Sequence, residues 1–341
     1  MRKKLLLKAL AAAAMMLPAT AIAADANYFK GKTMTIIVPY GPGGTYDQYA
    51  QIFAEYLGRH VPGEPNVIVQ HMPGAGGVNA MNWAYNVMPK DGLNMITPLD
   101  NGVVNQLMRP EKMRYDVRNF RWIGTTNQTN LVMAVRSDSG VKTWKDMVGK
   151  ELIGSSSGQD TSFIGSNLAN GLLGTNIRVI SGYKGSKAAM FAIEQGESQL
   201  SMYNWLAWNS VSHWLEGDKP FARVVLQLGG SKDPDIPADV PLMSDLVEKD
   251  EDRKIVDFIA SLGVLGRGLA LPPGVPDDIV ATLRTAYDKM NADPAFAADL
   301  TKRKLRLIPS KGADIQARVQ AAVDGATPEI VARASEMIYG M

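Results

Sequence analysis

The chain of 341 residues contains no cysteine. This absence excludes a disulfide scaffold, a lipid-modified cysteine anchor and a thiolate site. A chain of this length can bury a large core without disulfides, and its length suits two domains. Histidine is also scarce: the only three are His60, His71 and His213, and they form neither an HExxH motif nor a paired-ligand pattern. We therefore expect no zinc site and no cofactor.

A large excess of positive charge is missing too. The chain has 36 lysines and arginines against 34 aspartates and glutamates, and four of the basic residues lie in residues 1–23, which hold no acidic residue. Beyond residue 23 the balance is 32 against 34, a net charge of −2. No broad basic patch is implied, so we expect no nucleic-acid partner.

Apolar runs long enough to span a bilayer are absent, and a short run lies at the N-terminus. Residues 2–8 are rich in lysine and arginine, residues 5–17 form the apolar run, and residues 21–23 (Ala-Ile-Ala) are a small-residue cleavage pattern. This order of features is typical of a secretory signal peptide, and the run is too short for a membrane span. We predict a signal peptide over residues 1–23, cleaved after Ala23 or Ala24, and a periplasmic location. An ordinary buried helix is the alternative interpretation.

The sequence does contain one local arrangement twice. A predicted strand over residues 33–38 leads into the glycine-rich turn 39–47, and a predicted strand over residues 67–72 leads into the turn 73–77. A helix is predicted after each turn. Such turns can aim backbone N–H groups at one point, next to a helix N-terminus, which favours anions. The pair therefore predicts a site for a carboxylate or phosphate, although glycine turns also serve purely structural needs.

Strands and helices alternate along most of the chain, which predicts α/β architecture with largely parallel sheets. A second series of predicted strands covers residues 151–154, 177–180 and 200–203, and each strand is followed by a polar or glycine-rich segment and a helix. Open α/β sheets bind ligands beyond the C-terminal ends of their strands. We therefore expect the second series to contribute to the site.

One loop of the second series also fits the nucleophile elbow of serine hydrolases. Residues 154–158, Gly-Ser-Ser-Ser-Gly, match G-x-S-x-G between a strand and a helix. A catalytic triad would need an acid and a histidine later in the chain, and only His213 follows. A secreted hydrolase with Ser156 as nucleophile is therefore the alternative. We favour a loop whose hydroxyls and amides receive one end of an anion.

Four segments resemble a known family. Residues 36–47, I-I-V-P-Y-G-P-G-G-T-Y-D, look like its VPF-xxGG-xxD opening, and residues 73–77 match its PGAGG turn. Residues 182–186 are similar to its YKG segment, and residues 270–276 to its AP-x-G-x-P segment. The family is the TctC/Bug group, the periplasmic solute receptors of tripartite tricarboxylate transporters. The resemblance covers essentially the whole chain after the signal peptide.

The resemblance implies a two-lobed α/β fold of the periplasmic-binding-protein (Venus-flytrap) type, with each lobe a mostly parallel sheet flanked by helices. We expect residues 24–125 plus 228–341 to form the first lobe and residues 126–227 the second. The lobes would close on a small organic carboxylate, such as a di- or tricarboxylate or an acidic amino acid. The protein would deliver it to large and small membrane permease subunits. We expect a monomer without enzymatic activity. A ligand sensor for a membrane kinase is a further alternative.

The family's ligand positions can be carried onto this chain residue by residue. In the first lobe they are Tyr40, Gly43, Gly44, Thr45 and Asp47, together with Gly74, Ala75 and Gly77. In the second lobe they are Ser156, Ser157, Gly158, Thr161 and Asn204, to which we add Tyr203 as the neighbour of Asn204. We expect one carboxylate between the two glycine-rich turns. Asp47 is expected to shape the site, because its own charge would repel an anion.

Three features depart from the family's pattern. Asp160 stands where the family usually has a small residue, and residues 89–92 carry one residue more than the usual PDG. Trp205, Trp208 and Trp214 crowd a helix that the family makes less aromatic. We expect these rings to pack in the core, with an aromatic wall that selects a ring-bearing or longer ligand as the alternative. The departures bear on the identity of the carboxylate, which the sequence leaves open.

Overall fold

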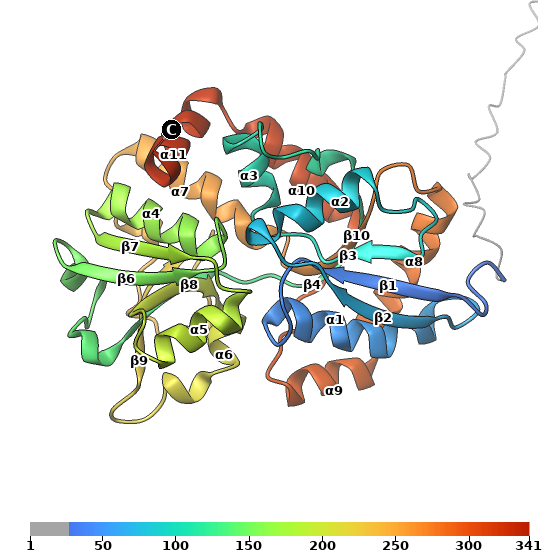
Figure 1. Ribbon diagram of the computed structural model, residues 1–341, viewed down its shortest axis with the longest axis horizontal. Coiled ribbons are helices and arrows are strands. Elements are labelled where there is room, and N and C mark those ends of the chain that lie inside the picture. The colour runs from blue at the N-terminus through green and yellow to red at the C-terminus, as the bar shows by residue number, and fades with distance from the viewer. Residues whose placement is uncertain (1–26, 341) are drawn as a thin grey trace, which may run out of the picture.

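The computed structural model describes residues 27–340. The expected signal peptide and its cleavage after Ala23 or Ala24 lie outside this range. Two β-sheets stand side by side, each with its own helices (Figure 1). Within the described residues no helix is both long and apolar enough to cross a membrane.

The first sheet has six strands and forms the right half of Figure 1. Its strand order is β11-β4-β10-β3-β1-β2. The strands are β1 (Thr33–Val38), β2 (Asn66–His71), β3 (Asn94–Ile96), β4 (Arg121–Asn127), β10 (Arg267–Leu271) and β11 (Ser310–Lys311).

The second sheet has five strands in the order β7-β6-β8-β5-β9. The strands are β5 (Leu131–Arg136), β6 (Glu151–Ser156), β7 (Asn176–Ser181), β8 (Leu200–Asn204) and β9 (Ala222–Leu228). β5 is an almost continuous apolar run and is buried along most of its length, as expected for a central strand covered on both faces.

The two-lobed α/β fold is confirmed, but each sheet is mixed rather than mostly parallel. β2 and β3 pair with β1 in parallel, and β7 and β8 pair with β6 in parallel. β10 is antiparallel to β3 and β4, and β5 is antiparallel to β8 and β9. β5 and β10 are the first paired strands after the chain crosses between the lobes. Each therefore starts at the boundary between the lobes and runs away from it, antiparallel to the strands that end at that boundary.

Eleven α-helices cover the sheets within the described residues. Beside the first sheet lie α1 (Thr45–Tyr56), α2 (Val78–Asn86), α3 (Gly102–Met108), α8 (Asp277–Asn291), α9 (Pro294–Lys302) and α10 (Gly312–Gly325). Beside the second lie α4 (Thr161–Leu173), α5 (Ser186–Glu194), α6 (Trp205–Asn209), α7 (Asp250–Ala260) and α11 (Pro328–Tyr339).

Helix α8 shows how the sequence builds the first core. Its buried side chains include Ile279, Leu283, Tyr287 and Met290, which fall on one face at helical spacing. Two aspartates in its first turn complement the helix dipole. The ring of Tyr287 meets that of Phe53 edge-on at 5.6 Å, which ties α8 to α1 on the same face of the sheet.

Helices α7 and α11 come from the C-terminal part of the chain but pack with the second sheet. Ile255, Ile259, Ala334 and Ile338 join the core cluster that contains β5 and β6 side chains. We therefore propose that α7 and α11 be counted with the second lobe, although the sequence assigned residues 228–341 to the first.

Candidate functional site

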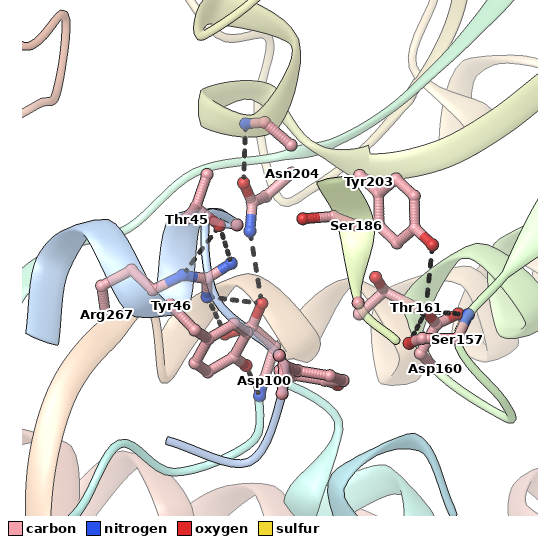
Figure 2. A pocket seen from close by; sticks show the side chains of 15 residues that line it. Thr45, Tyr46, Asp100, Ser157, Asp160, Thr161, Ser186, Tyr203, Asn204 and Arg267 are labelled. Atoms are coloured by element: carbon pink, nitrogen blue, oxygen red, sulfur yellow. Dashed lines mark hydrogen bonds and ion pairs between the residues drawn. The ribbon is translucent and has the colours of Figure 1, made fainter. Parts of the chain in front are cut away.

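A cavity lies between the two lobes, beyond the C-terminal ends of β1, β3, β6 and β8 (Figure 2). We call it the central cavity. Its lining residues are Tyr40, Gly41, Gly44, Thr45, Tyr46, Asp100, Ser157, Asp160, Thr161, Gly185, Ser186, Tyr203, Asn204, Ala207 and Arg267. Both lobes contribute, as expected for a site at the ends of parallel strands.

Two wider spaces adjoin the central cavity. The outer groove, of about 390 Å³, is lined by residues 73–77 and 181–185 and shares Tyr40 and Ser157 with the cavity. The side groove, of about 320 Å³, lies between α1, α5 and α6 and shares Thr45 and Ser186 with it. The central cavity therefore shares lining residues with a groove on either side of it.

The predicted site residues divide among these spaces. The central cavity takes Tyr40, Gly44, Thr45, Ser157, Thr161, Tyr203 and Asn204. The outer groove takes Gly74, Ala75, Gly77 and Gly158, and the side groove takes Gly43. Asp47 and Ser156 line none of the three spaces. The cavity borders only the first of the two predicted glycine turns, because β2 is the edge strand and its turn lies farther out.

The lobes are in direct contact around the cavity. The backbone N–H of Gly41 donates to the carbonyl of Lys184 at 3.1 Å, and Asn101 Nδ2 donates to the carbonyl of Gln159 at 3.1 Å. Only about 30 Å³ of the cavity is open to the centre of a water molecule. Ligand pockets usually measure ~300–1,000 Å³, so a ligand of several heavy atoms requires the lobes to part.

The glycine turn before α1 leaves the helix N-terminus free. Gly44 is the N-cap residue, and no side chain caps the first amides of α1. Behind the turn, Asp47 Oδ2 accepts the N–H of Gly43 at 2.7 Å, and Asp47 Oδ1 lies 2.7 Å from His71 Nε2. Burial alone would raise the pKa of Asp47, but hydrogen bonds from Gly43, Gln51 and His71 hold it below its ordinary value.

Helix α5 presents a second uncapped N-terminus to the same cavity. Its N-cap residue is Gly185, again without a side-chain cap. The two helix starts face each other, since a Cβ built on Gly44 would lie 2.9 Å from Ser186 Oγ and 4.0 Å from Ser186 N. Helix N-termini carry partial positive charge and free N–H groups. One helix start from each lobe thus borders the position where an anion could bind both.

A buried ion pair forms the first-lobe wall. Arg267 Nη1 donates to both carboxylate oxygens of Asp100, at 2.6 and 2.8 Å, and both residues are buried. Arg267 Nε and Nη2 donate to Thr45 Oγ1 at 3.3 and 3.0 Å, and the guanidinium lies 3.8 Å from the Tyr46 ring centre. Desolvation lowers the pKa of Arg267, but the charge and hydrogen bonds of Asp100, together with the neighbouring Tyr46 and Tyr40, outweigh it and raise the pKa.

Asp160 organises the second-lobe wall, and only 2% of it is exposed. Its Oδ1 accepts the N–H groups of Ser162 and Phe163 at 3.0 and 3.2 Å, which caps α4. Its Oδ2 accepts from Ser157 N at 2.9 Å, Ser157 Oγ at 2.5 Å and Tyr203 Oη at 3.2 Å. Desolvation nevertheless raises the pKa of Asp160, because it outweighs these hydrogen bonds.

Asn204 links the two walls, and the tryptophans after it do not reach the cavity. Asn204 Oδ1 accepts the N–H of Ala207 at 3.2 Å, while its Nδ2 lies 3.5 Å from Asp100 Oδ2 in the other lobe. Trp205 and Trp208 belong to a buried cluster, and Trp208 Nε1 donates to a backbone carbonyl of β5 at 2.8 Å. The core interpretation of these two rings therefore holds. Trp214 belongs to the same buried cluster but also lines the side groove.

Ser156 does not have the surroundings of a nucleophile. Its hydroxyl donates to the carbonyl of Gly158 at 2.8 Å and lies 2.8 Å from Ser181 Oγ, and the residue is fully buried. Within residues 27–340 no histidine forms a hydrogen bond with it, and His213 stacks edge-on against Trp214 instead. The G-x-S-x-G match therefore lacks the base that a triad requires.

Sequence reasoning missed eight lining residues: Gly41, Tyr46, Asp100, Asp160, Gly185, Ser186, Ala207 and Arg267. Asp100 could have been found, since it follows β3 just as the predicted turns follow β1 and β2. Arg267 gave no such signal, because it begins an antiparallel strand and reaches the cavity from that strand's N-terminal end.

Two lobes around an enclosed polar cavity define a solute-binding protein. Residues 50–333 match the family described as tripartite tricarboxylate transporter family receptor, so the chain belongs to that family, which is one of receptors. A UPF0065 protein of Bordetella pertussis (strain Tohama I) is 25% identical over 300 residues, which cover 85% of each chain.

Solved structures share the fold at low sequence identity. R. palustris Rpa4515 with adipate is 19% identical with a TM-score of 0.69, over 89% of this chain and 97% of that one. MatC (Rpa3494) from Rhodopseudomonas palustris with bound malate is 18% identical with a TM-score of 0.68, over 91% of this chain and all of that one.

Proposed function

We propose that this protein captures a small organic carboxylate between its lobes, with one carboxylate group held by the first amides of α1 and α5. The observation that carries the proposal is that both helices start at a glycine without a side-chain cap, from opposite lobes, at one cavity. Free N–H groups at helix N-termini are suited to anions. Proteins of the same fold were solved with adipate and with malate, which supports the ligand class.

Capture in this arrangement would stabilise the closed protein. An anion that binds α1 and α5 together interacts with both lobes only when they lie close on either side of it, so it shifts the population toward a closed form with room for the ligand. We propose that the closed, monomeric protein then docks on the large and small permease subunits of a tripartite transporter. It makes and breaks no bond, and it works in the periplasm after removal of residues 1–23.

Calorimetry of the purified protein against a panel of carboxylates tests the proposal. Gly44→Asp places a carboxylate at the start of α1, and Gly44→Asn places a neutral side chain of the same shape there. The backbone of Gly44 suits either residue, with φ −79°. Because like charges brought together cost several kcal/mol, we expect Asp to lower carboxylate affinity at least ~100-fold more than Asn does. Equal effects of the two substitutions, or no binding of any carboxylate to the unaltered protein, would refute the proposal.

A further inference from the structure

The charges that line the central cavity do not balance. Three charged side chains border it: Asp100, Asp160 and Arg267. Arg267 is matched by Asp100 in a close ion pair. Asp160 forms no ion pair with any residue in the described range 27–340, and its partners are backbone amides and two hydroxyls. With Asp160 ionised, the lining therefore carries one uncompensated negative charge.

The part of the second-lobe wall around Asp160, unlike the start of α5, offers hydrogen-bond acceptors to the cavity. Ser157 Oγ and Tyr203 Oη each donate to Asp160 Oδ2, at 2.5 and 3.2 Å. A hydroxyl has a single hydrogen, and an ionised carboxylate can only accept. Both hydrogens are therefore committed to Asp160, and these two hydroxyls can offer a ligand only their lone pairs.

The opposite side of the cavity offers donors. The first amides of α1 have no side-chain cap, and Thr45 Oγ1 accepts two N–H groups from Arg267. The hydroxyl hydrogen of Thr45 is thereby left for donation. Figure 2 shows the two sets on opposite sides, with Thr45 and Arg267 facing Ser157, Asp160 and Tyr203.

From this polarity we infer that the ligand is an amino-carboxylate whose protonated nitrogen binds Ser157 and Tyr203, and that Asp160 sets this preference through those two hydroxyls. The inference rests on the proposed function, which places the carboxylate group at α1 and α5. A second carboxylate would meet lone pairs and the charge of Asp160. An ammonium group has three donors for the acceptors, and its charge balances Asp160.

Matched ligand pairs test the inference by calorimetry. Succinate and β-alanine, glutarate and 4-aminobutyrate, and adipate and 5-aminopentanoate differ only in a terminal carboxylate or ammonium group. We expect the tightest-binding pair to favour its amino member at least ten-fold. Dicarboxylates that bind more tightly than their amino partners would overturn the inference and leave the carboxylate receptor standing. Failure of both series and of every other carboxylate in the panel to bind would overturn the proposed function as well.

Asp160→Asn separates a role in selectivity from one in structure. An Asn side chain can keep the cap of α4 through Oδ1, while its Nδ2 donates to the two hydroxyls and frees their hydrogens for the ligand. The hydrogen bond from Ser157 N to Oδ2 is lost, because Nδ2 cannot accept it. We expect the ratio of amino-carboxylate to dicarboxylate affinity to fall at least ten-fold. A purely structural role would weaken both ligands alike and leave the ratio unchanged, which would contradict the inference.

Tyr203→Phe provides an independent test that leaves the other four hydrogen bonds of Asp160 in place. It removes one acceptor, so we expect it to weaken the amino member several-fold more than the dicarboxylate. Tyr85→Phe is the matched control, since the Tyr85 hydroxyl binds Asn119 away from the cavity. An equal loss for both ligand types in Tyr203→Phe would count against the inference even if Asp160→Asn did not fold.

Discussion

Two aspartates fasten the loops that face each other across the cavity, in different electrical surroundings. Asp47, in the first turn of α1, accepts the N–H of Gly43 and lies against His71, behind the loop. Asp160, the N-cap residue of α4, accepts the N–H of Ser157 and borders the cavity with no cation beside it. An aspartate that accepts a loop N–H therefore occurs on both sides of the cavity, but only Asp160 adds its charge to the lining.

The pKa values of the two carboxyl groups differ in direction for this reason. Hydrogen bonds from Gly43, Gln51 and His71 overcome burial and lower the pKa of Asp47, whereas burial prevails and raises the pKa of Asp160. Behind the first wall, hydrogen bonds compensate the charge of Asp47, and the start of α1 stays free for an anion. On the second wall the carboxylate caps the helix itself, so the wall repels an anion.

Arg267→Met should abolish the electrical difference between the two walls, and we expect it to have the largest effect on stability. It leaves Asp100 buried without its cation, so both walls become negative. Removal of one partner from a buried ion pair costs ~3–5 kcal/mol, and we expect a loss of that size in the free energy of unfolding measured with urea. Binding of any carboxylate should be lost too.

The double variant Arg267→Met, Asp100→Asn is the control for that prediction. It removes both charges, so most of the lost stability should return. A single variant as stable as the unaltered protein would mean that Asp100 does not depend on Arg267.

Asp47→Asn should have the next largest effect. It removes the charge that Gly43, Gln51 and His71 bind, while its remaining oxygen can still accept. A hydrogen bond to a charged group contributes ~1.5–3 kcal/mol against ~0.5–1.5 kcal/mol for a neutral one, so only part of each bond's contribution is lost. We expect a loss of about 1–3 kcal/mol at pH 7 by urea unfolding. Because the folded-state pKa is lowered, this contribution is complete above the ordinary value of 3.8 and disappears as the pH falls through the folded-state pKa. A loss that stayed constant down to pH 2 would contradict this account.

The contrast between the walls also explains what the sequence could predict. The turn at residues 39–47 and the loop at 155–161 were found because both follow apolar strands and precede helices. Local patterns of this kind encode the strands, the helix starts and the polar loops. They led correctly to the two-lobed fold, with half of the predicted site residues at the central cavity.

Long-range pairing could not be predicted in the same way. Arg267 and Asp100 are 167 residues apart, and their ion pair depends on β10 entering the sheet next to β3. The place of the second glycine turn depends on β2 being an edge strand, which no local pattern states. The capping role of Asp160 was local, but its missing cation is a property of the folded protein.

Gly41→Ala tests whether the two walls meet in the ligand-bound protein. Gly41 has an ordinary φ, so alanine suits its backbone, but a Cβ there would lie 2.6 Å from the carbonyl oxygen of Lys184 in the other lobe. We expect the closed state to be disfavoured and ligand affinity to fall about ten-fold, or about 1.4 kcal/mol, by calorimetry.

Gly230→Ala is the matched control for Gly41→Ala. A Cβ on Gly230 would meet nothing within 4 Å, and its φ is also ordinary. Its affinity and thermal stability should equal those of the unaltered protein. If Gly41→Ala behaves in the same way, the lobes do not approach this closely when ligand is bound.

The smallest effect we expect is a difference in the sign of two pH dependences. Asp160 keeps its proton in the folded protein at pH values where the unfolded chain has lost it, because its folded-state pKa is raised. Its contribution to stability is therefore complete below the ordinary value of 3.8 and declines as the pH rises through the raised pKa.

Relative to Asp160→Asn, the unaltered protein should lose stability as the pH rises through this window. Relative to Asp47→Asn, it should gain stability as the pH rises toward 3.8. Urea unfolding of the three proteins between about pH 2.5 and 7 compares the slopes, and slopes of the same sign would show that the two carboxylates share one electrical environment after all.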